Sequence, residues 1–149
     1  MSSRTRLANE AWEALLGAHA ELMRRFAAAE LWQEISMREY DVLYSLARAE
    51  RPLSLVELNR HVLLSQPALS RMVERLADRG LIHRERSSDD GRSVRLSLSA
   101  RGAELQRRVG LAHGREVGVA LSDRLDRGEL EDLARLCRRL SSEPARVAA

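Results

Sequence analysis

The chain has 149 residues, 44% of them hydrophobic, which is enough apolar material for one globular domain with a core. Only 3% are aromatic and every basic residue is arginine, so the core must be mainly aliphatic and the formal net charge of +3 comes from arginine. A single cysteine, Cys137, excludes an intramolecular disulfide. No apolar run is long enough for a membrane span or a secretory leader, so we expect a cytoplasmic protein.

Apolar residues recur along the chain at two spacings, and the spacing separates helices from strands. Spacings of three and four indicate helices, and strict alternation indicates half-buried strands. Predicted helices cover residues 7–31, 37–49, 55–61, 66–79, 100–121 and 127–140, and predicted strands cover residues 81–86 and 93–98. Ser36 with Glu39, and Ser54 with Glu57, are capping boxes that set the starts of the second and third helices.

The fourth predicted helix has the clearest start and stop signals. Ser65 is its N-cap, and Pro67 lies in the first turn, where a missing N–H costs nothing. Gly80 is suited to the left-handed conformation that commonly ends a helix. A short helix followed by a well-capped one is typical of a helix-turn-helix, whose second helix enters the major groove of DNA.

Two short strands follow that helix directly, around a charged tip. Residues 87–92 between the strands are of turn-forming types. From Arg60 to Arg95 there are eight arginines against five acidic residues, an excess that equals the formal net charge of the whole chain, +3. The positive charge therefore lies on the helix-turn-helix and the hairpin, which favours a polyanion such as DNA as partner.

These elements predict a mainly α fold of the α+β winged-helix type. A winged helix-turn-helix lobe at 36–99, with a two-stranded wing, is flanked by N- and C-terminal helical regions at 7–31 and 100–140, all within one domain, 1–149. The flanking helices carry wide apolar stripes and have no sheet to bury them against, so we expect them to pack together and with a second copy of the chain. A two-fold dimer would present recognition helices to two half-sites roughly 34–36 Å apart.

This pattern resembles the MarR family of bacterial winged-helix regulators over nearly the whole chain, 8–140. The family's wing pattern is matched at Asp90, Arg92, Val94 and Leu98. Ser99 replaces the usual threonine, whereas Ser87-Ser88 and Gly91 depart from the pattern and suggest a more flexible wing.

The resemblance implies a homodimeric transcriptional regulator that binds a pseudo-palindromic operator in double-stranded DNA. Family members are usually repressors, and many release DNA when a small aromatic or phenolic effector binds. Others sense oxidation through a cysteine. The apolar spacing around Cys137 in the last helix indicates packing, so redox sensing through Cys137 is kept only as an alternative. No catalytic residue, cofactor or metal site is expected.

Candidate DNA contacts lie on the fourth helix and the wing. A glutamine pairs well with adenine, and an arginine pairs with guanine or with phosphate. The candidates are Ser65, Gln66, Pro67, Ala68, Ser70, Arg71, Arg75, Arg84, Arg86, Asp90 and Arg92. Arg92 at the wing tip is suited to a narrow minor groove, and Asp90 would orient it, since a carboxylate repels phosphate. The structural alternatives are a solvated helix face and a surface salt bridge, which is weak by itself.

The resemblance also implies an effector pocket between the flanking helices and the winged lobe. The candidates for its wall are His19, Trp32, Tyr40, Tyr44 and His113. The structural alternative is that the two tyrosines, one helical turn apart, belong to the core, and that the histidines are surface or capping residues.

Two other classes of function fit the sequence less well. A winged helix that binds a protein partner would carry an acidic or apolar recognition face, whereas this one carries Arg71 and Arg75. The nucleophile-elbow, zinc-protease, P-loop and dinucleotide motifs of common enzyme classes are all missing from the sequence. The sequence therefore predicts a DNA-binding regulator and not an enzyme.

Overall fold

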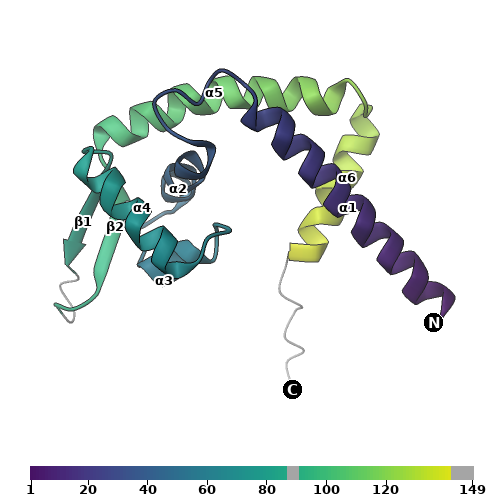
Figure 1. Cartoon of the computed structure of the whole chain (residues 1–149), viewed down its shortest axis with the longest axis horizontal. Coiled ribbons are helices and arrows are strands. Elements are labelled where there is room, and N and C mark those ends of the chain that lie inside the picture. Colours follow the sequence, from purple (N-terminus) through teal and green to yellow (C-terminus); the bar gives the residue numbers. More distant parts are fainter. Residues whose placement is uncertain (87–90, 142–149) are drawn as a thin grey trace. The chain divides into compact units, whose positions relative to one another are not determined.

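The computed structural model describes residues 1–86 and 91–141. Within them lie six helices and two strands (Figure 1): α1 (Ser3–Ala27), α2 (Met37–Arg48), α3 (Leu55–Asn59), α4 (Gln66–Asp78), β1 (Ile82–Arg86), β2 (Val94–Leu98), α5 (Ala100–Ser122) and α6 (Arg127–Ser141). The chain divides into two compact units, Met1–His113 and Gly114–Ala149. The predicted mainly α winged-helix fold is confirmed. In the part of the chain that is described, none of the helices has the length and apolar character that crossing a membrane requires.

The first helix starts and ends four residues earlier than the sequence predicts. Ser2 caps it, because its hydroxyl accepts a hydrogen bond from the backbone N–H of Thr5 at 3.1 Å. At the other end the indole N–H of Trp32 donates to the carbonyl of Phe26 at 2.7 Å. This bond folds the chain back after Ala27, so residues 28–31 form a turn where the apolar stripe predicted helix.

The capping residues of the helix-turn-helix act as the sequence predicts, although α3 is shorter. Ser54 and Ser65 accept hydrogen bonds from the backbone N–H groups of Glu57 and Ala68, at 3.2 and 3.3 Å. The predicted third helix reaches residue 61, whereas α3 ends at Asn59, whose side chain donates to the carbonyl of Leu64 at 2.9 Å. That bond turns the chain toward α4 two residues early.

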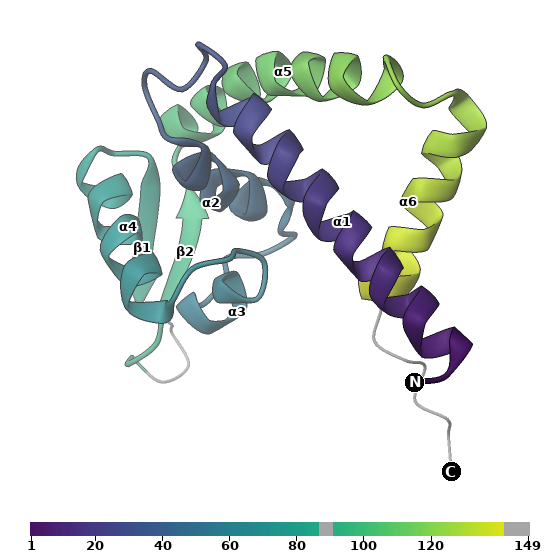
Figure 2. The ribbon, with the colours of Figure 1, turned by 45° about the vertical axis from the view of Figure 1, so that its right-hand side comes forward.

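The wing is an antiparallel hairpin in which Ile82 lies opposite Leu98. Leu53, just before α3, adds a short bridge to it: its N–H donates to the carbonyl of Leu96 at 2.9 Å, and the N–H of Leu96 donates back at 2.7 Å. Figure 2 shows α2, α3 and α4 gathered beside the two strands. No pattern in the sequence predicts this third segment, because a single bridged residue has no periodicity.

One continuous core holds the winged lobe together. Its most deeply buried side chains, each less than 2% exposed, are Val42, Leu43, Leu58, Leu69, Leu76 and Leu81. Burying an aliphatic side chain of this size is worth roughly 1.5–3 kcal/mol. Because α2, α3, α4 and both strands all contribute to this core, α4 is packed against the rest of the winged lobe along its buried face.

The end of α4 and the start of α5 are tied together through Ser99. Its hydroxyl donates to the carbonyl of Gly80 at 2.6 Å and accepts from the backbone N–H of Gly102 at 2.9 Å. Gly80 has a φ of 75°, the left-handed conformation that the sequence predicts. A Cβ at Gly102 would lie 2.0 Å from the carbonyl oxygen of Leu81, so only glycine allows this approach.

The two end helices leave most of their apolar residues exposed within the single chain. Of the described residues of α1, Phe26 alone is buried, and α6 buries none. The exposed large apolar residues of these two helices are Leu7, Trp12, Leu15, Leu16, Leu133, Leu136 and Leu140. Cys137, expected to be packed, is also exposed. Each of the two helices therefore has an apolar face that its own compact unit does not cover.

Candidate nucleic-acid interface

The N-terminal half of α4 presents polar and basic side chains to solvent. Ser65, Gln66, Pro67, Arg71 and Arg75 are exposed, and Ala68 and Ser70 are half-buried. The opposite face is buried through Leu69, Met72, Val73 and Leu76. Among the residues that the structure describes, neither Arg71 nor Arg75 forms a salt bridge with an acid. Their guanidinium groups are therefore available to an external anion, and this face can enter a groove.

The wing places further arginines on the surface. Arg84 and Arg86 of β1 are exposed, and in the register of the hairpin they lie opposite Leu96 and Val94. Arg92 is exposed and directly follows Gly91. The φ of Gly91 is 65°, a backbone conformation that residues with a Cβ rarely adopt. Asp90, predicted to orient Arg92, lies outside the described residues.

Glu57 fastens the wing to α3. Its carboxylate accepts hydrogen bonds from Arg51 at 2.8 and 3.1 Å and from Arg95 of β2 at 3.4 Å. It also accepts from the backbone N–H of Ser54 at 2.9 Å, which completes the capping box. The bonds from Arg51 and then from Ser54 lower the pKa of Glu57 to about 2. The carboxylate therefore stays ionised at neutral pH and links loop, helix and strand.

A second group of predicted residues forms an aromatic cluster. The His113 ring lies with its centroid 5.2 Å from Phe26, 5.3 Å from Trp32 and 5.6 Å from Tyr40. Tyr44 stacks on Tyr40 at 5.9 Å. The structure thus brings together four of the five predicted effector residues. His19 is exposed on α1 and makes no described ring contact with them.

Two side chains at this cluster, Tyr40 and Asp41, have a shifted pKa. Burial raises the pKa of the Tyr40 hydroxyl, an effect that a hydrogen bond with Gln106 partly offsets. Burial likewise raises the pKa of the Asp41 carboxyl, and electrostatic attraction to His113 partly offsets this rise. A Cβ at Gly110 would lie 3.0 Å from the Tyr40 hydroxyl oxygen, so a small residue on α5 makes room for that group. The rings therefore pack against one another, and Tyr40 and Trp32 join the cluster to the core of the winged lobe.

The MarR family's sequence model matches residues 35–94, which run from the residue before the cap of α2 to the first residue of β2. No curated protein sequence matches the chain. Together with the winged-helix geometry above, the match to the family model shows that residues 35–94 of the chain are similar to the MarR family. Members of that family are transcriptional regulators and not enzymes.

Solved structures of transcriptional regulators share the fold. Sco3205 from Streptomyces coelicolor, in complex with DNA, is 24% identical over 100% of this chain and 94% of that one, with a TM-score of 0.76. A mutant of MarR from E. coli, complexed with operator DNA, is 21% identical over 95% of this chain and 100% of that one, with a TM-score of 0.76. PcaV from S. coelicolor, in complex with its natural ligand, is 28% identical over 89% of this chain and 90% of that one, with a TM-score of 0.66.

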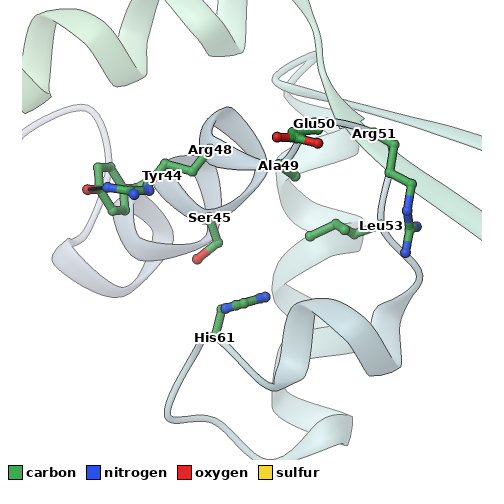
Figure 3. A pocket seen from close by; sticks show the side chains of 8 residues that line it. All are labelled: Tyr44, Ser45, Arg48, Ala49, Glu50, Arg51, Leu53 and His61. Carbon is green, nitrogen blue, oxygen red and sulfur yellow. Dashed lines mark hydrogen bonds between the residues drawn. The ribbon is translucent and has the colours of Figure 1, made fainter. Parts of the chain in front are cut away.

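Beside the aromatic cluster, the chain has an open hollow of about 720 Å³. It is lined by Tyr44, Ser45, Arg48, Ala49, Glu50, Arg51, Leu53 and His61 (Figure 3). Arg48 lies over the ring of Tyr44, 5.6 Å from its centroid, and donates to its hydroxyl at 2.9 Å. Tyr44 thus belongs both to the cluster and to the hollow. It is the one predicted effector residue that lines the hollow.

Sequence reasoning missed several residues of these sites. Phe26 was readable as part of an apolar stripe, but nothing in the stripe pointed to His113. Glu57 was readable as a helix cap, whereas its bonds to Arg51 and Arg95 depend on the fold. Within residues 1–86 and 91–141, no group of histidine, cysteine and acidic side chains could hold a metal ion.

Proposed function

We propose that this protein is a DNA-binding repressor of the MarR family that acts as a homodimer and is released by a small-molecule effector. The observation that carries the DNA-binding part is the exposed, basic face of α4, with its apolar side fixed in the core and with Arg84 and Arg86 beside it on the wing. A protein that binds bacterial operators acts in the cytoplasm.

The side chains of α4 and the wing divide by their chemistry. Gln66, Ser70 and Arg71 read base edges or adjacent phosphates from the major groove, and Ala68 and Pro67 allow close approach. Ser65 caps the helix and offers its backbone N–H to a phosphate. Arg75, Arg84 and Arg86 bind phosphates, and Arg92 enters the minor groove with Asp90 as its orienting partner. This assignment follows from residue type and exposure.

The exposed apolar residues of α1 and α6 support the homodimer. Leu7 is 65% exposed and Leu140 is 75% exposed, although both lie on amphipathic helices. Large apolar faces of this kind are usually covered by another subunit. A two-fold dimer carries two copies of α4, and these match a pseudo-palindromic operator whose half-sites are roughly 34–36 Å apart.

The aromatic cluster supports a small aromatic or phenolic effector. PcaV, a relative of the same fold, has been solved with its natural ligand. In this chain the cluster and the hollow share Tyr44, so a planar ligand has both a stacking surface and space beside it. An effector that separates the two lobes of the dimer would move the recognition helices out of register with successive major grooves. His19, exposed on α1, would take part only through such a rearrangement or from the partner copy.

A redox-responsive regulator acting through Cys137 is the second candidate, because that thiol is exposed in the single chain. Its neighbours Leu133, Leu136 and Leu140 lie on the same helix, so the proposed dimer would cover the thiol. A winged helix that binds a protein partner is disfavoured by the basic face of α4.

The test is fluorescence anisotropy over a salt series, with a duplex that the protein enriches from a random-sequence pool and a scrambled duplex of the same composition. A repressor of this kind binds the enriched duplex at least about 1,000-fold more tightly, with a steep loss of affinity as salt rises. Equal, weak binding to both duplexes would contradict sequence-specific DNA binding. A screen of phenols and aromatic acids against the bound complex then tests effector release.

A further inference from the structure

The C-terminal end of the recognition helix is held by one arginine. Arg79, the C-cap of α4, donates from Nη1 to Oε2 of Glu39 at 3.0 Å and from Nη2 to the backbone carbonyl of Glu34. Its own carbonyl accepts a hydrogen bond from Arg101 of α5 at 3.3 Å. Arg79 therefore joins α4 to the start of α2, to the α1–α2 loop and to α5.

The partners of Arg79 are themselves fixed. Oε1 of Glu39 accepts from the backbone N–H of Ser36 in the capping box of α2, while its other oxygen faces Arg79. The carboxylate of Glu34 forms a two-armed pair with Arg108 of α5, at 2.8 and 2.9 Å. Glu34 follows Trp32 by two residues, so the loop that receives Arg79 also carries a ring of the aromatic cluster.

We infer that Arg79 is a positioning residue for DNA recognition: its two-armed contact with Glu39 and Glu34 sets the direction in which α4 enters the groove. The inference rests on the proposed function and adds a residue that does not itself touch DNA. A planar guanidinium suits the task, because its donors point in fixed directions and reach two acceptors at once.

Helix length explains why this distant contact matters. The helix α4 has 13 residues, and Arg79 lies at the end opposite to the groove-facing Gln66. At a rise of about 1.5 Å per residue, a tilt of roughly 5° about the C-cap moves the N-terminal end by roughly 1.7 Å. A shift of that size breaks hydrogen bonds to base edges. Contacts with the flexible, uniformly charged phosphate backbone tolerate it better.

The experiment compares Arg79→Lys with the wild type on the enriched and the scrambled duplexes over a salt series. Lysine keeps the charge but loses the fork. The expected result is an operator affinity lower by on the order of 10-fold, with unchanged affinity for the scrambled duplex and an unchanged salt slope. Arg107→Lys is the matched control, because Arg107 is exposed on α5 and pairs with Glu104, three residues before it on the same helix. It should change neither affinity.

A second variant guards against loss of folding. Glu39→Gln keeps a side chain that completes a capping box but removes the charge that Arg79 contacts. It should lower operator affinity by roughly 3-fold, again without affecting the scrambled duplex. Wild-type affinity in both variants overturns the inference. So does an equal loss on both duplexes, which would make Arg79 a phosphate contact. A wild type that does not distinguish the duplexes overturns the proposed function, and the inference with it.

Discussion

Two amphipathic helices of similar length, α4 and α6, differ in how far the single chain buries their apolar faces. The 13 residues of α4 bury their whole apolar stripe, with Leu69 and Leu76 at 0% exposure. The 15 residues of α6 bury nothing, and Leu136 is 46% exposed. An apolar stripe therefore predicts that a face of a helix will be buried, but it does not predict which molecule buries that face.

The difference lies in what each helix has beside it. Around α4, the strands, α2 and α3 supply buried side chains from both directions in sequence, and these form one core. The unit that contains α6 offers little: among its described residues, Ala120 is the one that is buried. The winged lobe is thus complete within one chain, whereas the stripes of α1 and α6 are completed only in the proposed dimer.

The largest effect is expected from a change in the buried core of the winged lobe, on the inner face of α4. Leu76→Ala should lower the free energy of unfolding by roughly 2–5 kcal/mol, because a fully buried leucine leaves a cavity. Urea denaturation followed by circular dichroism measures the loss. Leu63→Ala is the matched control, since Leu63 is 87% exposed and should cost little. A cost below about 1 kcal/mol for Leu76→Ala would show that the lobe core is not tightly packed.

A change on the exposed apolar face of α6 should weaken the association of two copies of the chain and leave the winged lobe folded. Leu136→Glu on α6 should weaken the dimer by roughly 3 kcal/mol, on the order of 100-fold in its dissociation constant, because it places an uncompensated charge in the proposed interface. Sedimentation velocity over a concentration series measures this, and Asp132→Glu on the same helix is the control. A Leu136→Glu protein that stays as dimeric as the wild type would place the interface elsewhere.

A change at the wing tip should alter DNA binding alone, because it should leave the core of the winged lobe and the apolar faces of α1 and α6 intact. Arg92→Ala is expected to weaken binding to the enriched duplex by about 1–3 kcal/mol through loss of a minor-groove contact. Anisotropy gives the affinity, and an unchanged unfolding curve shows that the hairpin is intact. Unaltered affinity would exclude the wing-tip role.

The salt bridges of Glu57 make the stability of the lobe depend on pH in the acid range. The folded-state pKa of Glu57, about 2, lies below its ordinary value of 4.5, so its contribution is fully present above 4.5 and is lost as pH falls toward 2. Glu57→Gln should therefore destabilise the protein at pH 6 and converge with the wild type near pH 2. Parallel stability curves for the two proteins would show that Arg51 and Arg95 do not stabilise that carboxylate in solution.

The smallest effect is expected at Cys137. Cys137→Ser should leave operator binding, and its response to peroxide, unaltered, because packing against a partner copy is the role that the helix pattern favours. Anisotropy before and after peroxide treatment measures both. An oxidant response that is present in the wild type and missing in the variant would instead support redox regulation.

The features that could be predicted from the sequence depend on contacts between residues close together along the chain. Ser36, Ser54 and Ser65 cap helices through bonds to residues three positions away, and Gly80 ends α4 by its own backbone freedom, so each could be predicted from neighbouring residues. Alternation of apolar residues likewise identified the wing. The fold class and the basic face of α4 followed from such short-range patterns.

Tertiary structure alone decided the long-range contacts. Leu53 joins Leu96 across the lobe, and Arg79 reaches Glu39, forty positions away. The cluster unites Phe26 with His113, while the equally plausible His19 stays apart on the surface. Periodicity records which face of a helix is apolar. It carries no information about which distant side chain meets that face, because that choice is made only when the elements pack.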